Sequence, residues 1–302
     1  MTDITLLTDS RYVNPSNPDW YVQNILEEDR LLRQALEQHG LKINRINWDD
    51  PSYNWKATRF ALFRTTWDYF NRFPEFSEWL QKVRKQTHLI NPCELILWNL
   101  DKHYLHDLRR LGIAIPPTLF LEPGDERPLT EIVRATGWSE CILKPAVSGA
   151  ARHTYRFRST AAPEYESIYR QLIENESMLL QEFQQNVLHK GEVAFMVFGG
   201  KFTHAVLKRA RPGDFRVQDD FGGSVHPCTP TPEEVALAER VVSVCQPVPV
   251  YARVDILWSN HGEPCVSELE LIEPELWFRM YPPAAQLFAE ALLKYINEQF
   301  AG

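Results

Sequence analysis

The sequence predicts a mixed α/β and α+β chain, with a mostly parallel sheet near the N-terminus and an antiparallel sheet near the C-terminus. In residues 1–97, short apolar strand patterns alternate with amphipathic helix patterns, which is typical of a parallel sheet covered by helices. Residues 112–186 read as a small α+β unit, and the remainder reads as antiparallel strands followed by a closing helix. We therefore expect three units, over 1–97, 98–186 and 187–302.

The first unit contains the strand patterns DITLLTD, KINRINW, FALFRTTW and HLIN. Helices are predicted near 21–39, with Gly40 just beyond the end, and near 75–85. Ligands of parallel sheets lie beyond the carboxyl ends of the strands. The loops after the first and third strands therefore supply candidate substrate residues, namely Asp9, Arg64, Trp67 and Asp68. The alternative for Arg64 and Asp68 is an ordinary ion pair within a loop.

The second unit begins with a helix predicted over 100–111, after which prolines and a glycine interrupt the pattern. The segments SECILKPAVSGAARHTYRF and SMLLQEFQQ lie on either side of a helix predicted near 163–174. Apolar strand patterns that flank a helix indicate a small α+β unit.

The third unit is expected to be built from two hairpins and two helices. The sequence FGGK at 198–201 predicts a tight hairpin turn. A second hairpin joins VYARVDILW to PCVSELELI, with the turn expected over residues 259–263 and the pairing counted from a loop at His261 and Gly262. Helices are predicted over 232–245 and 284–300.

Composition places the chain among ordinary globular proteins, with 302 residues, 44% hydrophobic and 24% charged. The net charge of -8 argues against a nucleic-acid partner or an anionic membrane surface. Five cysteines without a C-x-x-C pair argue against a zinc site or a disulfide framework and favour a reducing cytoplasm. The chain shows neither a signal peptide nor an apolar run near the roughly 18 residues of a membrane span. The oligomeric state stays open, a homodimer included.

Three carboxylates gather on the second hairpin. With the two-residue loop, antiparallel pairing sets Asp255 opposite Glu268 and Arg253 opposite Glu270. Paired residues have Cβ atoms roughly 4.5–5.5 Å apart, and the period of two keeps Glu268 and Glu270 on one face. Such a trio repels itself unless a cation lies between its members, and oxygen ligands of this kind suit Mg²⁺. The alternative is a solvated strand face with Arg253 as its counter-ion.

Two lysines and a loop of small residues suggest a polyphosphate site. Lys102 follows Asn99-Leu-Asp, and Lys144 ends an apolar strand just before a proline. The loop that follows contains Ser148 and Gly149, whose small side chains let backbone N–H groups approach phosphate. The alternatives are a solvated helical Lys102, a surface Lys144 and a plain flexible turn.

Further candidates follow along the chain. A strand runs into Gln181, Glu182 and Phe183, where backbone groups and a carboxamide can meet an adenine edge, and Glu192 comes next as a possible partner of ribose hydroxyls. The polar run 208–223 contains Arg216, whose guanidinium would stabilise charge on a transferred phosphoryl group. The alternative for residues 181–183 is a purely structural role. The alternatives for Glu192 and Arg216 are a solvated strand residue and a solvated loop residue.

The order of these motifs resembles that of the ATP-grasp superfamily, in particular its glutathione-synthetase-like branch. The resemblance runs from about Asn99 to Pro274, and includes the lysine of LKP, the glutamate and aromatic pair after a strand, GE, an arginine before GG, and RVD followed by ELE. More narrowly, FRTTWDYF at 63–70 is similar to the group that contains the cycloserine-forming O-ureidoserine cyclo-ligase. The resemblance implies a Rossmann-like pre-ATP-grasp domain, a small lid subdomain and a C-terminal subdomain that carries the metal site.

By that resemblance, Lys102 and Lys144 hold ATP phosphates, the segment 181–183 holds adenine, and Glu192 holds ribose. The carboxylate trio holds one or two Mg²⁺ ions, or Mn²⁺ in their place, and Arg216 contacts the transferred phosphate. Two departures stand out: the phosphate loop has one glycine where many relatives have several, and Glu270 stands where they have asparagine.

The predicted activity is an ATP-dependent ligase for a small, amino-acid-like substrate. A carboxylate attacks the γ-phosphate to form an acyl-phosphate, and an amine then displaces phosphate to give an amide or a ring. A carboxylate kinase of the same fold, or an ATP-binding regulatory protein, is the alternative.

Overall fold

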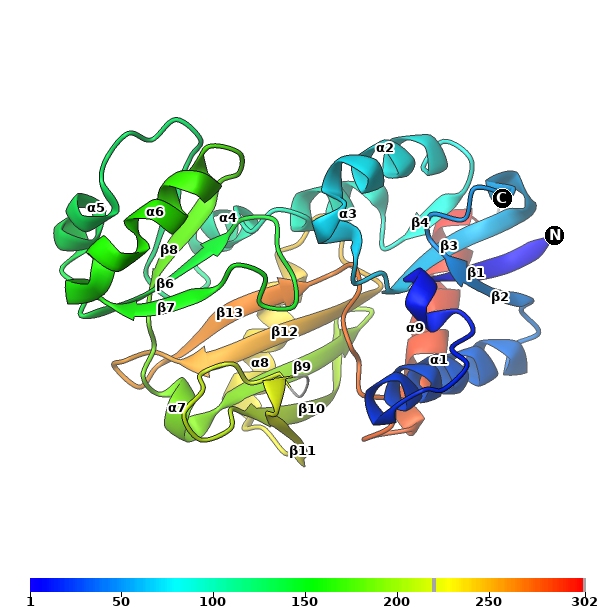
Figure 1. Ribbon diagram of the computed structural model, residues 1–302. Helices are drawn as coiled ribbons and strands as arrows, with labels where there is room; N and C mark the ends of the chain where they lie inside the picture. Colours follow the sequence, from blue (N-terminus) through cyan, green and yellow to red (C-terminus); the bar gives the residue numbers. More distant parts are fainter. Residues whose placement is uncertain (219–220, 301–302) are drawn as a thin grey trace.

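The computed structural model describes residues 1–218 and 221–300 and contains three sheets (Figure 1). The N-terminal sheet has the order β2-β1-β3-β4, and all of its pairs are parallel, as predicted. Its strands are β1 (Thr2–Thr8), β2 (Ile43–Asn47), β3 (Thr58–Thr65) and β4 (His88–Ile90), and its helices are α1 (Trp20–Gln38) and α2 (Phe73–Val83).

The helix predicted over 100–111 is present but shorter, as α4 (Tyr104–Arg110). The sequence did not predict α3 (Cys93–Asn99), which precedes it. Asn99 ends α3 by donating to the backbone oxygen of Leu269 and accepting from the backbone N–H of Leu271, both at 2.8 Å. This side chain therefore fastens the helix end to the strand that carries Glu268 and Glu270, and it leaves Lys102 in the turn between the two helices.

The second unit is an antiparallel sheet of order β5-β8-β6-β7, seen on the left of Figure 1 with two helices over it. Its elements are β5 (Thr118–Leu121), α5 (Leu129–Thr136), β6 (Glu140–Pro145), β7 (Tyr155–Arg158), α6 (Ala162–Ile173) and β8 (Met178–Glu182). The sequence reading missed β5 and α5. Prolines mark the approaches to both elements, and a proline before an element is compatible with a strand or helix that begins after it.

The central sheet has the order β11-β10-β9-β12-β13 and is antiparallel, as predicted. It follows α7 (Val187–Lys190) and contains β9 (Glu192–Phe198), β10 (Lys201–Arg209), β11 (Ser224–Cys228), β12 (Tyr251–Trp258) and β13 (Pro264–Glu270), with α8 (Pro232–Ser243) on one face. The turn between β9 and β10 has positive φ at both Gly199 and Gly200, in agreement with the prediction from FGGK.

The turn expected over residues 259–263 is confirmed. The two-residue loop at His261 and Gly262, from which the pairing was counted, is wrong, although that pairing is right. The loop spans residues 259–263, since Trp258 pairs with Pro264. A register shift between Asp255 and Ile256 then adds one residue on β13, so Asp255 still faces Glu268 and Arg253 still faces Glu270. The longer loop and the bulge cancel each other.

The closing helix α9 (Pro283–Phe300) packs beside α1 under the N-terminal sheet (Figure 1). One hydrophobic core joins β1 and β3, the helices α1 and α9, and the buried face of β9. Leu6, Leu36, Met196 and Phe288 are fully buried members of this core. The N-terminal and central sheets are therefore packed as one body by the last helix of the chain.

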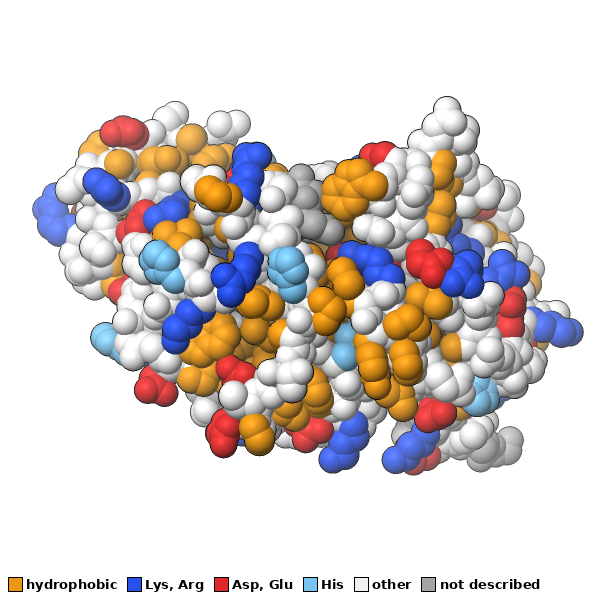
Figure 2. Space-filling model, turned by 90° about the horizontal axis from the view of Figure 1, so that it is seen from below, with side chains coloured by type: hydrophobic (Ala, Val, Ile, Leu, Met, Phe, Trp, Pro, Cys, Tyr) orange, Lys and Arg blue, Asp and Glu red, His pale blue; other side chains and the backbone are white. Residues whose placement is uncertain are grey.

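The surface carries charges of both signs. Figure 2 shows lysines and arginines interspersed with acidic and hydrophobic side chains across one face. Large exposed hydrophobic residues include Trp20, Leu111 and Tyr281. Among the described residues, the helices are too short or too polar to cross a membrane.

Candidate active site

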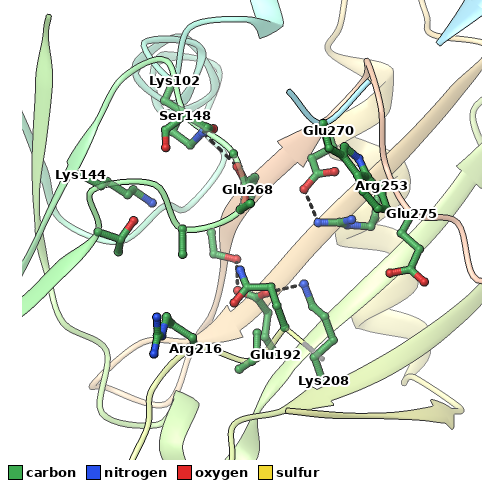
Figure 3. Close-up of a pocket in the computed structure, with 18 of the residues that line it drawn as sticks. Lys102, Lys144, Ser148, Glu192, Lys208, Arg216, Arg253, Glu268, Glu270 and Glu275 are labelled. Carbon is green, nitrogen blue, oxygen red and sulfur yellow. Dashed lines mark hydrogen bonds and ion pairs between the residues drawn. The ribbon is translucent and has the colours of Figure 1, made fainter. Parts of the chain in front are cut away.

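A cavity of about 720 Å³ lies where the three sheets meet, a size typical of a small-molecule site. Residues from the loops after β1 and β3, from the second unit and from the open face of the central sheet line it. Figure 3 shows that its charged side chains converge from different strands and loops. Each sheet supplies one wall, so the cavity is a product of how the three units pack.

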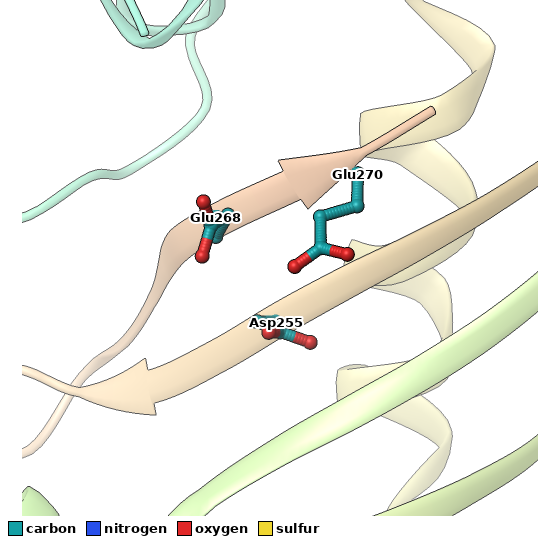
Figure 4. Close-up of side chains that lie close together, drawn as sticks. All are labelled: Asp255, Glu268 and Glu270. Carbon is teal, nitrogen blue, oxygen red and sulfur yellow. The ribbon is translucent and has the colours of Figure 1, made fainter. Parts of the chain in front are cut away.

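Glu268 and Glu270 on β13 line this cavity, and Asp255 on β12 lies buried beside them (Figure 4). One oxygen from each side chain lies within 4.8 Å of the others. Three carboxylate oxygens at this spacing form a donor set that fits Mg²⁺ or Mn²⁺. The geometry that the sequence predicted for these side chains is present.

Basic side chains surround the trio. Arg253 contacts Asp255 at 2.9 Å and also pairs with Glu270. Lys208 pairs with Asp255 at 2.7 Å, and Lys102 approaches Glu268 to 3.2 Å. Figure 3 shows Arg253 and Lys208 reaching in from the central sheet and Lys102 from the opposite wall. Arg253 is therefore a counter-ion of the carboxylates, as the alternative reading expected, and the three carboxylates are also close enough to bind a metal.

These cations decide which carboxylates stay charged. Burial alone would raise the pKa of Asp255, but Arg253 and Lys208 outweigh it and lower that pKa. Burial also opposes ionisation of Glu268, whose pKa is nevertheless lowered, chiefly by Lys102. For Glu270, burial wins over the attraction of Arg253 and raises the pKa to about 8.

The two predicted phosphate lysines face each other across the cavity. Lys102 is buried and donates from Nζ to the backbone oxygen of Ser148 at 2.5 Å, so the alternative of a solvated helical lysine is wrong. Lys144 ends β6 and lines the cavity. Burial, reinforced by the charge of Lys102, lowers the pKa of Lys144 to about 8 even though Glu268 opposes the shift.

In the loop 147–151, two alanines adopt backbone conformations that usually favour glycine. Ala150 and Ala151 have φ of 47° and 54°, in the left-handed region that non-glycine residues rarely adopt. Gly149 is required for a different reason, because a Cβ there would lie 2.6 Å from the ring of Phe70. Ser148 donates from Oγ to the backbone oxygen of Arg152 at 3.0 Å. The loop therefore rests against the motif at 63–70 of the N-terminal unit.

The segment 181–183 lines the other end of the cavity. The carboxamide of Gln181 donates to the hydroxyl of Thr118 at 2.9 Å. The guanidinium of Arg156 lies 3.9 Å from the ring centre of Phe183. Glu182 lies between them at the end of β8. These contacts give the proposed adenine end one polar and one aromatic wall.

Glu192 lies next to the trio. Its carboxylate pairs with Lys208 at 2.6 Å and accepts from the hydroxyl of Ser267 at 2.7 Å. Figure 3 shows Glu192 and Lys208 on neighbouring strands of the central sheet. A ribose hydroxyl at this position would share the carboxylate with Lys208.

Arg216 also lines the cavity, in the loop between β10 and β11. Its guanidinium pairs with Asp214 at 2.7 Å and lies 4.0 Å from the ring centre of Phe221. Residues 219–220 of the same polar run lie outside the described residues. The pair with Asp214 holds the Arg216 side chain at the wall of the cavity.

The four predicted substrate residues have different environments. Trp67 lines the cavity and donates from its indole N–H to the backbone oxygen of Glu273 at 2.9 Å. Arg64 is buried under Phe278 and faces Asp29 at 3.4 Å. The remaining two residues are carboxylates with partners of their own: Asp9 accepts hydrogen bonds from Arg11, and Asp68 accepts them from Trp48 and Arg72. The alternative considered for Arg64 and Asp68, an ion pair within a loop, takes another form: Arg64 pairs with Asp29, and Asp68 pairs with Arg72.

Sequence reasoning missed Glu273 as a site residue. Glu273 lines the cavity three positions beyond Glu270, and its carboxyl is hydrogen-bonded to the buried hydroxyl of Tyr69. The strand has ended at Glu270, so the period of two that located the trio gives no signal here. The repeated acids of ELELIEPE were the available hint.

Two family models match separate parts of the chain. Residues 158–271 match the RimK-like ATP-grasp domain, and residues 4–91 match the N-terminal domain of the D-cycloserine synthetase DcsG. The matched region, residues 158–271, is an ATP-grasp domain. The ATP-grasp fold and the narrower resemblance at 63–70 that the sequence predicted are confirmed.

Named relatives agree with this assignment. The cycloserine biosynthesis protein DcsG of Streptomyces lavendulae is 29% identical over 281 residues, which cover 88% of this chain and 93% of that protein. A probable alpha-L-glutamate ligase of Maridesulfovibrio salexigens is 30% identical over 186 residues, 61% of this chain and 59% of its own length. The crystal structure of D-cycloserine synthetase DcsG superposes with a TM-score of 0.85 at 26% identity, covering 97% of this chain and 99% of that one. The prediction that the chain is an ATP-grasp ligase is confirmed as a class of enzyme.

Proposed function

We propose that this ATP-grasp ligase joins a carboxylate to an amine on amino-acid-like substrates, through an acyl-phosphate, with ATP and Mg²⁺. The observation that carries the proposal is the convergence of three carboxylate oxygens within 4.8 Å with Lys102, Lys144 and Arg216 around one cavity. Phosphoryl transfer needs positioning and charge neutralisation more than a side-chain nucleophile. This set of side chains matches that need.

Bound ATP would supply the phosphoryl group that activates the carboxylate, and Mg²⁺ would neutralise charge on its phosphates. The chain's own residues have separate tasks. Asp255, Glu268 and Glu270 would hold the metal, and the two lysines would hold phosphate oxygens. Arg216 would stabilise the group in transfer. The second unit, as a lid over ATP, would exclude water that hydrolyses an acyl-phosphate.

The proposed substrate end lies between the N-terminal and central sheets. Trp67, Tyr69 and Trp277 line it together with Arg11 and Glu273. This mixture of aromatic, basic and acidic groups suits a small zwitterion. The match of residues 4–91 to the N-terminal domain of a D-cycloserine synthetase supports a ring-closing ligation among the reactions to test. We propose a cytoplasmic location, supported by five cysteines that all remain free thiols.

The test measures phosphate release from ATP and Mg²⁺ across a panel of amino acids, aminooxy acids, including O-ureidoserine, and dipeptides. Glu268→Gln should lower the rate by about 100-fold or more, as removal of a preorganised charge-stabilising group does. Glu268 is the better target because Asp255 is buried against Arg253 and Lys208, so its removal would leave unpaired buried charge.

Three outcomes would contradict the proposal. Near-normal magnesium-dependent turnover by Glu268→Gln would contradict the assignment of the three carboxylates as a metal site. Product formation without any amine would indicate a carboxylate kinase, and ATP binding without phosphate release on the whole panel would indicate a regulatory protein. The exposed loop variant Glu263→Gln is the matched control.

A further inference from the structure

Glu273 occupies the junction between the substrate end and the phosphate end of the cavity. It follows β13, the strand that carries two of the proposed metal ligands. Its backbone oxygen accepts the indole N–H of Trp67, and its carboxyl is hydrogen-bonded to Tyr69. Two residues of the motif at 63–70 therefore hold Glu273 in place from the opposite unit.

Of the six glutamates that line the cavity, Glu273 and Glu182 have no lysine or arginine within salt-bridge distance in the described part of the chain. Four cavity-lining glutamates each have a lysine or arginine within salt-bridge distance: Glu192 with Lys208, Glu268 with Lys102, Glu270 with Arg253, and Glu275 with Arg279. Figure 3 shows several of these pairs. For Glu273, the described part of the chain offers a phenol in place of a cation. A carboxylate without a cation partner keeps its capacity to take up a proton.

The proposed reaction needs such a proton acceptor. An alkylamine substrate, such as the α-amine of an amino acid, arrives at neutral pH as an ammonium ion, which has no lone pair with which to attack. It must lose one proton before the C–N bond forms. The nitrogen loses a second proton as the C–O bond to phosphate breaks and phosphate leaves with the electron pair, and that second proton balances on the departing phosphate.

We propose that Glu273 is the general base that takes the first proton from the ammonium group of the substrate, with Tyr69 as its positioning residue. This inference rests on the proposed ligase function and adds a catalytic residue to it. In the step, the N–H bond breaks and an O–H bond forms on the Glu273 carboxylate, after which the freed lone pair attacks the acyl carbon. The trio, in contrast, is committed to the metal.

The surroundings of Glu273 adjust its basicity to this task. Burial raises its pKa to about 7, partly countered by the hydrogen bond from Tyr69 and the charge of Lys102, while the charge of Glu268 adds to the rise. Glu270 and the phenol of Tyr251 also face this group. A base is most effective when its pKa lies near the working pH.

The experiment compares two amine acceptors in Glu273→Gln, which preserves the shape and a hydrogen-bonding oxygen for Tyr69. The carboxylate substrate in this experiment is the acid that gives the highest rate of phosphate release in the panel described above. With its normal amine, we expect kcat to fall about 100-fold or more. With hydroxylamine, which is largely uncharged at neutral pH and so arrives without the extra proton, we expect hydroxamate to form at close to the wild-type rate.

The pH profile adds a second readout. The wild-type rate with the normal amine should rise as the pH passes through about 7 and Glu273 ionises, and the variant should lack this rise. Tyr69→Phe should retain most of the rate. Its rise in rate should shift to higher pH, because the lost hydrogen bond lowers the pKa of Glu273 in the wild type. Glu263→Gln should have the wild-type pH profile.

The outcomes separate this inference from the proposed function. Wild-type ligation by Glu273→Gln, or an equal loss with both acceptors, would overturn the role of Glu273 while leaving the ligase assignment intact. Hydroxamate formed by the variant also demonstrates a folded, ATP-competent protein. If the wild-type protein releases no phosphate with any acid on the panel, the ligase proposal fails and this inference fails with it.

Discussion

Lys144 illustrates how burial changes the use of a single side chain. Its pKa is lowered to about 8 by burial and by Lys102, so the amine is mostly charged at pH 7 and loses its charge as the pH rises through about 8. A neutral amine binds phosphate less well than an ammonium ion does. We expect the KM for ATP of the wild-type protein to increase above that pH.

Lys144→Arg provides the check, because a guanidinium stays protonated throughout this pH range. We expect its KM for ATP to be almost independent of pH between 7 and about 9.5. Steady-state kinetics at saturating carboxylate and amine measure both profiles. The same rise above pH 8 in the arginine variant would assign the effect to another group.

Gly149 makes a second prediction at the scale of one residue. An added Cβ would lie 2.6 Å from the ring of Phe70, and overpacking of this kind costs about 1–3 kcal/mol. Gly149→Ala should therefore raise the KM for ATP by displacing the loop that neighbours Lys102. Phe70→Leu, which removes the ring, should restore part of the loss in the double variant. Purely additive effects in the double-mutant cycle would contradict a direct contact.

At the scale of elements, the hairpin of β12 and β13 is fixed in place by asparagines from outside it. Asn99 bonds to the backbone at Leu269 and Leu271, and Asn91 bonds to the backbone at Tyr251 and Leu271. Each of these side chains is buried. The strands that carry the trio are therefore held from α3 and from the end of β4 as well as by their own ladder.

Asn99→Ala should lower the free energy of unfolding by about 1–3 kcal/mol, because it leaves a buried carbonyl and N–H without a partner. It should also raise the Mg²⁺ concentration needed for half-maximal activity, since β13 loses its anchor beside Glu268 and Glu270. Urea unfolding and Mg²⁺ titration measure the two effects. The exposed Asn175→Ala serves as control, and equal stability of the two variants would refute the anchoring role.

At the scale of the whole molecule, a ligand in the cavity touches walls from three units. A ligand that binds only the folded state stabilises it by about 2.7 kcal/mol at a hundred times its Kd. We expect a non-hydrolysable ATP analogue with Mg²⁺ to raise the Tm by several degrees. The same analogue with EDTA should give a smaller increase.

Glu268→Gln should lose the part of the increase that depends on Mg²⁺, whereas Glu263→Gln should retain it. Differential scanning fluorimetry measures the Tm of the three proteins with the analogue and either Mg²⁺ or EDTA. If EDTA leaves the shift in wild-type Tm unchanged, the carboxylate trio does not bind metal together with the nucleotide.

Local patterns were sufficient for much of this fold. Strand and helix periodicity predicted the parallel N-terminal sheet, the antiparallel central sheet and the turn at Gly199 and Gly200. The pairing of Asp255 with Glu268 was also predicted, but only because a five-residue loop and a bulge offset each other. Such a coincidence has no signal in strand alternation, since a bulge depends on the packing of both faces.

The sequence by itself determined the order of the motifs, the residue types of the phosphate and metal sites, and the face that the acids share on β13. These depend on spacing within a strand or turn. Tertiary structure alone decided that Lys102 turns into the cavity, that Arg64 pairs with Asp29, and that Glu273 meets Tyr69. Each of those outcomes joins side chains from units far apart in the chain, so it depends on how the sheets pack rather than on any local period.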